Sequence, residues 1–131
     1  GDKLPVFVWI HGGAYMMGAS NNPYYDGTAF AKDGVILVSI NYRLHALGFY
    51  SSKYTYKKYG TTGNWGHLDM IEALKWVRNH IESFGGDPDK VTIGGESAGS
   101  MAVSSLVLSP LAKGLFNREW HYLKLSLCKF I

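Results

Sequence analysis

The sequence predicts an α/β fold, in which a mostly parallel sheet is flanked by helices. Two runs, residues 6–10 (VFVWI) and 35–40 (VILVSI), are continuously apolar, as expected of strands that are covered on both faces. A helical periodicity fills residues 67–84, and a third short apolar run at residues 91–94 precedes a second helical pattern at residues 98–108. Strands and helices that alternate in this way are typical of parallel neighbouring strands.

Three segments connect these elements. A glycine-rich loop follows the first strand, and a short helical turn is expected at residues 28–32, with Thr28 as its cap. Residues 41–66 are rich in aromatic side chains and are predicted to form a long loop. Two readings of its tyrosines and tryptophan remain open, the lining of a substrate gorge or the packing of the loop on itself: Tyr50, Tyr54, Tyr56, Tyr59 and Trp65.

The longest predicted helix has one apolar stripe. Glu72 with Lys75, and Arg78 with Glu82, are spaced to form ion pairs on its solvent side. The glycines at 85–86 permit a left-handed end of the helix. Spacings of three and four residues define the stripe: Leu68, Ile71, Leu74, Val77, Ile81 and Phe84.

Composition excludes several classes of protein. The 131 residues, 47% apolar and 18% charged, are typical of one globular domain. The net charge of +3 equals the contribution of Lys53, Lys57 and Lys58, so it does not indicate a nucleic-acid surface, and a solvated loop is the favoured reading of that segment. The single Cys128 rules out an internal disulfide, and no apolar run approaches the roughly 18 residues of a membrane span.

The segment GGESAG, residues 94–99, stands where the third apolar run passes into the second helical pattern. Either its glycines merely allow a tight turn, or Ser97 is presented there as a nucleophile. A strand-to-helix corner needs tiny residues two positions before and after the serine, as Gly95 and Gly99 are. It also puts Ser97 at a helix N-terminus, where the N–H of Ala98 can stabilise a developing negative charge.

A second small-residue loop, WIHGGAY, places His11, Gly12, Gly13 and Ala14 after the first strand. Backbone N–H groups of such a loop can approach a substrate oxygen and supply the other half of an oxyanion hole; a plain glycine turn is the alternative. The loop and the serine corner together favour the oxyanion hole. A phosphate-binding loop would need lysine where Ser100 stands, and the dinucleotide-binding glycine pattern is absent.

Several segments of the chain carry a resemblance to a known family: LPVFVWIHGGAYMMG, YDGTAFA, INYRLHALGF, the stretch from GNWGHLDM to GGESAGSMAVSSLVLSP, and LAKGLF. In these segments the chain resembles the type-B carboxylesterase and cholinesterase family of α/β-hydrolases. The resemblance runs from residue 4 to about residue 118, and residues 119–131 diverge. It implies that residues 1–131 form a single partial α/β-hydrolase domain.

The resemblance also implies an activity, the hydrolysis of a small-molecule carboxylic ester through an acyl-enzyme. It implies no cofactor, no metal and no nucleic-acid partner. The residues that match the family's site are the nucleophile Ser97, the oxyanion-hole residues Gly13, Ala14 and Ala98, and the site-shaping Gly12 and Glu96. His11 is expected to hold its loop by hydrogen bonding.

No residue of the chain matches the acid and histidine of the family's triad, which follow the serine. Glu119 and His121 do follow it, but two positions apart they do not fit a relay with the serine. The tail alternates Leu123, Leu125 and Leu127 like a strand. We therefore expect a fragment that is inactive alone and self-associates through uncovered sheet edges.

Three further residues bear on the family's pattern: one departs from it and two belong to it. His45 stands where the family has glycine and could perturb its loop, whereas Arg43 and Asp69 are expected to form a structural ion pair. A non-catalytic, cholinesterase-like binding or adhesion protein is the alternative function, although such relatives typically lose the serine. The family is often secreted, but we expect no signal peptide in this chain, and its localisation is left open.

Overall fold

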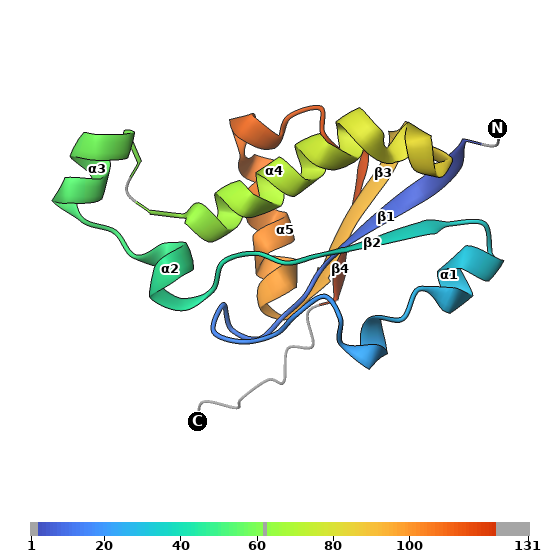
Figure 1. Ribbon diagram of the computed structural model, residues 1–131, viewed down its shortest axis with the longest axis horizontal. Coiled ribbons are helices and arrows are strands. Elements are labelled where there is room, and N and C mark those ends of the chain that lie inside the picture. Colours follow the sequence, from blue (N-terminus) through green and yellow to red (C-terminus); the bar gives the residue numbers. More distant parts are fainter. Residues whose placement is uncertain (1–2, 62, 123–131) are drawn as a thin grey trace, which may run out of the picture.

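The structure of the chain is a computed structural model, and it describes residues 3–61 and 63–122. Its centre is one four-stranded sheet in the order β2-β1-β3-β4, and every neighbouring pair of strands is parallel (Figure 1). The predicted α/β fold is confirmed. The strand predicted on Leu123, Leu125 and Leu127 lies outside the described residues. The four strands are β1 (Leu4–Ile10), β2 (Ile36–Ile40), β3 (Gly86–Glu96) and β4 (Arg118–Tyr122).

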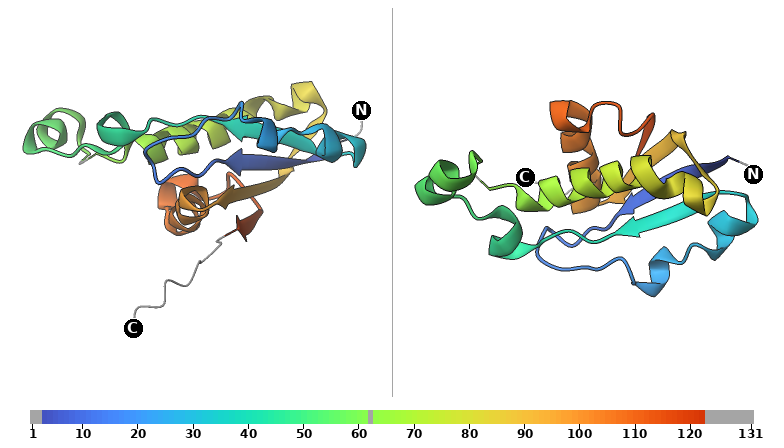
Figure 2. Two further views of the ribbon diagram at one scale, coloured as in Figure 1. Left: turned by 90° about the horizontal axis from the view of Figure 1, so that it is seen from below. Right: turned by 45° about the horizontal axis from the view of Figure 1, so that its top comes forward.

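In the described part of the chain, five α-helices accompany the sheet. Figures 1 and 2 show α4 and α5 lying along the strands, while α2 and α3 lie together at one end of the molecule. Within the described ranges, no helix has the length and apolar character needed to cross a membrane. The helices are α1 (Thr28–Lys32), α2 (His45–Phe49), α3 (Lys53–Tyr59), α4 (Trp65–His80) and α5 (Ala98–Leu108).

The core lies between the sheet and the two long helices. Val6, Val8 and Ile10 alternate along β1, are at most 1% exposed, and pack with α4 and α5. Each buried aliphatic side chain of this kind stabilises the fold by about 1.5–3 kcal/mol relative to an exposed position. Phe7 and Trp9 point to the opposite face and are only half-buried. The expectation that strands are covered on both faces is therefore met on one face only within the described residues.

The predicted loop at residues 41–66 is wrong in part, because it contains α2 and α3. The side chains of Ser52 and Thr55 form a reciprocal capping box at the start of α3, and Gly60 ends the helix with a φ of 70°. None of its residues is buried. Local capping rather than an apolar stripe specifies this helix, so hydrophobic periodicity did not indicate it.

Another correction concerns the start of α1. Thr28 is the first helical residue rather than the cap, and Gly27 occupies the cap position. The carboxylate of Asp26 accepts the backbone N–H of Thr28 at 3.0 Å. The acidic side chain two positions before Thr28 therefore performs the capping that was assigned to the threonine hydroxyl.

The apolar stripe of α4 is confirmed up to Ile81, and the Glu72–Lys75 pair forms at 3.2 Å. Phe84 departs from it, since its side chain is 63% exposed. The α-helix ends at His80 and continues as a 3-10 turn, whose three-residue period rotates later side chains out of the stripe. Gly85 then ends the turn with a φ of 85°, as predicted.

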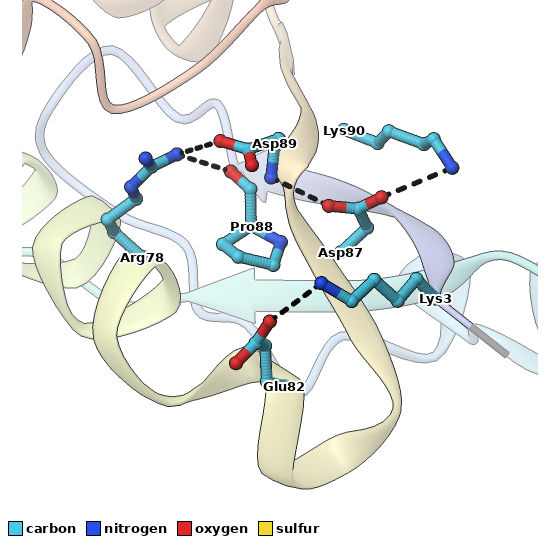
Figure 3. Close-up of polar contacts among 7 residues, drawn as sticks. All are labelled: Lys3, Arg78, Glu82, Asp87, Pro88, Asp89 and Lys90. Carbon is cyan, nitrogen blue, oxygen red and sulfur yellow. Dashed lines mark hydrogen bonds and ion pairs between the residues drawn. The ribbon is translucent and has the colours of Figure 1, made fainter. Parts of the chain in front are cut away.

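The expected ion pair between Arg78 and Glu82 does not form. Figure 3 shows that Arg78 binds Asp89 instead, at 2.6 Å, while Glu82 pairs with Lys3 at 3.1 Å. The Arg78–Glu82 pair is expected from spacing along the helix alone. The strand β3, however, returns beside the end of α4 and places Asp89 next to Arg78. These contacts lie at the N-terminal ends of β1 and β3.

His45 lies in an unusual backbone conformation. Its φ is 54°, in the left-handed region that favours glycine, and its N–H donates to the carbonyl of Tyr15 at 2.9 Å. The glycine that the resemblance expects at this position would adopt such a φ without strain, whereas histidine adopts it with strain.

Replacing this histidine by glycine should stabilise the chain. We expect His45→Gly to raise the free energy of unfolding by about 0.5–1 kcal/mol, because relief of left-handed strain exceeds the added entropy of the unfolded chain. Ala46→Gly, one position on in α2, should lower the free energy of unfolding by about 0.5–1 kcal/mol. Urea denaturation measures both, and two changes of the same sign would contradict the explanation.

Candidate active site

Ser97 occupies a sharp corner between the strand β3 and the helix α5. Its φ of 55° and ψ of −120° are strained for a residue with a side chain, at a cost of about 1–3 kcal/mol. The residue is exposed, whereas Ala98, Gly99 and Ser100 after it are buried. The corner therefore presents the serine hydroxyl to solvent from a rigid base.

The two glycines that flank the serine are required by close packing. A Cβ at Gly99 would overlap the carbonyl oxygen of Ile10, and a Cβ at Gly95 would lie 2.5 Å from the carbonyl carbon of Gly99. The first contact brings the first turn of α5 against the end of β1, and the second brings it against the end of β3. The sequence rule of tiny residues on either side of the serine thus has its cause in the contact between helix and neighbouring strand.

The His-Gly-Gly loop meets the serine corner directly. A Cβ at Gly12 would lie 2.5 Å from a carboxylate oxygen of Glu96 and 3.2 Å from Cβ of Ser97. The contact follows from the topology, because β1 and β3 are parallel neighbours with Ile10 beside Gly95, so their carboxyl ends meet at one edge. Ligands of open α/β sheets bind at this edge.

Beyond Gly12 the loop turns through three residues of positive φ: Gly13 at 109°, Ala14 at 55° and Tyr15 at 59°. The carbonyl of Gly13 accepts the N–H groups of Met16 at 2.8 Å and Met17 at 3.0 Å. Neither the N–H of Gly13 nor that of Ala14 donates to a residue of the described chain. Successive amides held in this way can bind an anion.

The loop rests on a buried pair of rings. His11, 1% exposed, donates from Nδ1 to the carbonyl of Gly12 at 2.8 Å, and its ring stacks on Tyr42 at 4.5 Å. The Tyr42 hydroxyl donates to the carbonyl of His11 at 2.7 Å. Burial raises the pKa of this hydroxyl, so it remains a donor. His11 thus forms a hydrogen bond within its loop, as expected from the sequence. The hydrogen bond from Tyr42 to this loop is not predicted by the sequence.

An ion pair fixes the segment that follows Tyr42. Asp69 accepts two hydrogen bonds from the Arg43 guanidinium, at 2.8 and 2.7 Å, and one from its backbone N–H at 2.9 Å. The structural pair expected from the sequence is thus confirmed. Burial by itself would raise the pKa of Asp69, but the hydrogen bonds and charge of Arg43 bring it below its usual value.

Tyr15 links the His-Gly-Gly loop to this segment. Its ring contacts Phe49 at 4.9 Å and His67 at 5.8 Å between centroids. Burial lowers the pKa of His67, which keeps its imidazole neutral among these rings. The packing holds the loop from the side that faces α4.

The strand β4 braces the serine corner from its other side. Its Tyr122 carbonyl accepts the N–H of Ser97 at 3.1 Å, and His121 Nδ1 lies 3.2 Å from the Ser100 hydroxyl. In the described part of the chain, no histidine forms a hydrogen bond with Ser97. His121 therefore joins β4 to α5 and does not form a relay with the serine.

The tyrosines of the predicted aromatic loop lie elsewhere. Four of them are between 56% and 67% exposed, and only Tyr59 packs on Trp65, with ring centroids 5.6 Å apart. Figure 1 shows α3, which carries three of them, at the far end of the molecule beyond α2. They line no gorge around Ser97, and most of them are not packed in a loop. Within the described residues no three His, Cys, Asp or Glu side chains group as metal ligands.

The sequence profile of the carboxylesterase family matches residues 1–119. The chain belongs to the carboxylesterase family. Human cocaine esterase is 53% identical over 118 residues, which are 89% of this chain and 20% of that protein. Para-nitrobenzyl esterase of Bacillus subtilis is 52% identical over 117 residues, which are 88% of this chain and 24% of that protein.

The fold is also that of solved carboxylesterases. The carboxylesterase of Geobacillus stearothermophilus superposes with a TM-score of 0.88 at 49% identity, over 92% of this chain and 26% of the solved one. The chain thus spans about a fifth to a quarter of the length of the relatives that it matches. The family's α/β-hydrolase architecture explains the parallel order of the strands.

The packing of Gly99 can be tested by adding one methyl group. We expect Gly99→Ala to lower the free energy of unfolding by about 2–3 kcal/mol, because its Cβ has no room beside Ile10. Gly114→Ala is the control, since nothing lies within 4 Å of a Cβ there and only its φ of 79° causes strain. It should cost about 1 kcal/mol. Equal losses in chemical denaturation would contradict the proposed close contact.

The Arg43–Asp69 pair makes stability depend on pH. A carboxyl whose pKa is lower in the folded chain contributes stability above its unfolded value, and this is lost as the pH falls through the folded value. We expect Asp69→Asn to destabilise the chain by about 1 kcal/mol at pH 7; the difference should shrink as the pH falls below about 3.9 and vanish below the lower pKa of the folded chain. Urea unfolding across this range measures it, and Glu72→Gln, at an exposed pair, should change stability by at most about 0.5 kcal/mol.

Proposed function

We propose that this chain carries the nucleophile and the oxyanion hole of a serine carboxylic ester hydrolase. The observation that supports this most is the contact of Gly12 with Ser97, which joins an exposed serine at a strained corner to a loop of free backbone amides. A merely structural glycine turn needs neither the exposed hydroxyl nor the neighbouring amides. Membership of the carboxylesterase family supports the same function.

In the proposed reaction, Ser97 Oγ attacks the carbonyl carbon of a small-molecule ester while a base takes its proton. The negative charge that forms on the carbonyl oxygen is stabilised by the N–H groups of Gly13, Ala14 and Ala98. The alcohol leaves with the proton, and an acyl-enzyme remains on the serine. Water then attacks the acyl carbon, releases the acid and restores the hydroxyl.

Two neighbours would shape this site. Gly12 lets the loop approach the serine, since any side chain there would collide with Glu96. Glu96 itself is half-buried with its carboxylate against Gly12. In the family it stands beside the catalytic histidine, and we propose that the histidine and the acid come from polypeptide other than residues 1–131.

A chimera tests this proposal. Residues 4–118 of this chain would replace the matching segment of the Bacillus subtilis para-nitrobenzyl esterase, to which the chain is 52% identical. We expect the chimera to hydrolyse para-nitrobenzyl esters, because the recipient supplies the remaining groups. Ser97→Ala in the chimera should reduce kcat/KM at least about 10³-fold, whereas Ser105→Ala, on the exposed side of α5, should leave it unchanged.

A fluorophosphonate probe adds a direct readout of the serine. Mass spectrometry of the labelled chimera should find the phosphonyl group on Ser97 alone. A chimera that folds with the thermal stability of the recipient but neither turns over ester nor accepts the probe would reject the proposed function. It would favour the non-catalytic binding or adhesion alternative.

The chain of residues 1–131 alone should show negligible esterase activity. A serine without a positioned base is a poor nucleophile, and no described histidine bonds to Ser97. Hydrolysis of a generic aryl ester, compared with the Ser97→Ala chain, measures this. Turnover that disappears in the variant would overturn the prediction and show that the chain supplies its own base.

A further inference from the structure

The sheet carries a continuous aromatic surface on the side opposite α4 and α5. Phe7 stacks on Phe30 with ring centroids 5.4 Å apart, and Trp120 stacks on Tyr122 at 5.9 Å. Trp120 and Tyr122 remain 47% and 48% exposed. We call this surface the aromatic face, and it consists of Phe7, Trp9, Tyr25, Phe30, Trp120 and Tyr122.

This face also has a hollow. An open depression of about 390 Å³ lies between Phe7, Leu37, Tyr25 and Trp120. All-parallel sheets normally have both faces covered, and large exposed apolar patches mark interaction sites. Aromatic side chains are the residues most enriched at the centres of protein interfaces. The aromatic face therefore has the character of an interface rather than of a solvated surface.

The charges at its two ends are opposite. Leu37, Phe7, Thr92 and Arg118 form one row across the four strands, with Arg118 at the β4 end. Asp26 lines the hollow at the Leu37 end of the row. Within residues 3–61 and 63–122, neither Asp26 nor Arg118 belongs to an ion pair. A face that is acidic at one end and basic at the other is complementary to itself after a half-turn.

We propose that the aromatic face is the interface of a homodimer. A two-fold axis that runs parallel to the strands, in the plane of contact and over the gap between β1 and β3, lays the β4 end of one copy over the β2 end of the other. Arg118 of each copy then meets Asp26 of its partner, and Trp120 lies over the partner's hollow. Isologous dimers of this kind are the commonest oligomers of soluble proteins.

Pairing through the sheet edges is the competing arrangement. Among the residues that the structure describes, no strand pairs with the outer edges of β2 and β4, and edge strands readily pair with one another. Edge pairing, however, leaves the rings of the aromatic face in water and does not require Asp26 to meet Arg118. The charge pattern therefore distinguishes the two arrangements.

A charge exchange tests the proposal on the whole chain. Sedimentation velocity over a concentration series should show a dimer that dissociates on dilution. Arg118→Glu and Asp26→Arg should each raise the dimer dissociation constant at least about tenfold, because like charges then face each other. An equimolar mixture of the two variant chains should recover the affinity of the original dimer, since both contacts are again between opposite charges.

Control variants separate these effects from loss of fold. Lys113→Glu makes the same charge change beyond the 3-10 turn that follows α5 and should leave dimerisation unchanged. Asp26 also accepts the Thr28 N–H, so Arg118→Glu combined with Asp26→Asn, which keeps an acceptor there, should recover most of the dimer. A chain that is monomeric at every concentration would overturn the proposal. So would a dimer that ignores both charge changes or that is not restored by mixing.

Discussion

The close approach of the first turn of α5 to the end of β1 is the constraint on which the candidate site depends. Gly99 lies against the carbonyl of Ile10, and Gly12 lies against Glu96 and Ser97. Because the two glycines have no side chains, the helix can approach the end of β1 closely and the loop can approach the serine corner closely. The chain turns at Ser97 with a positive φ, which exposes the hydroxyl beside loop amides that bond to no residue of the described chain. Packing of backbone on backbone thus brings the serine hydroxyl and the loop amides together.

Much of the fold could be predicted because strands and long helices are encoded locally. The apolar runs of β1 and β2 and the periodicities of α4 and α5 needed no knowledge of distant residues. Other features depend on what lies opposite in space. Arg78 binds Asp89 rather than Glu82 because β3 returns beside α4, and the capping of α3 by Ser52 has no apolar periodicity to reveal it.

The candidate site also has features that could be predicted from the sequence and features that could not. The nearness of the serine corner and the His-Gly-Gly loop could be inferred, because parallel neighbouring strands end at one edge. The contacts that hold these two segments in place could not be inferred. Tyr42 reaches His11 across 31 positions of the chain, and His121 reaches Ser100 across 21. Neither contact has a local pattern, since each depends on two elements that only the folded sheet brings together.

The helix α3 buries none of its residues and takes its order from its own caps. A segment that the core does not need is free to change in length without disturbing the strands or the serine corner. Insertions, deletions and grafted peptides should therefore be tolerated between α2 and α4 more readily than elsewhere. In evolutionary terms, this end of the molecule can diversify while the edge of the sheet that carries Ser97 stays fixed.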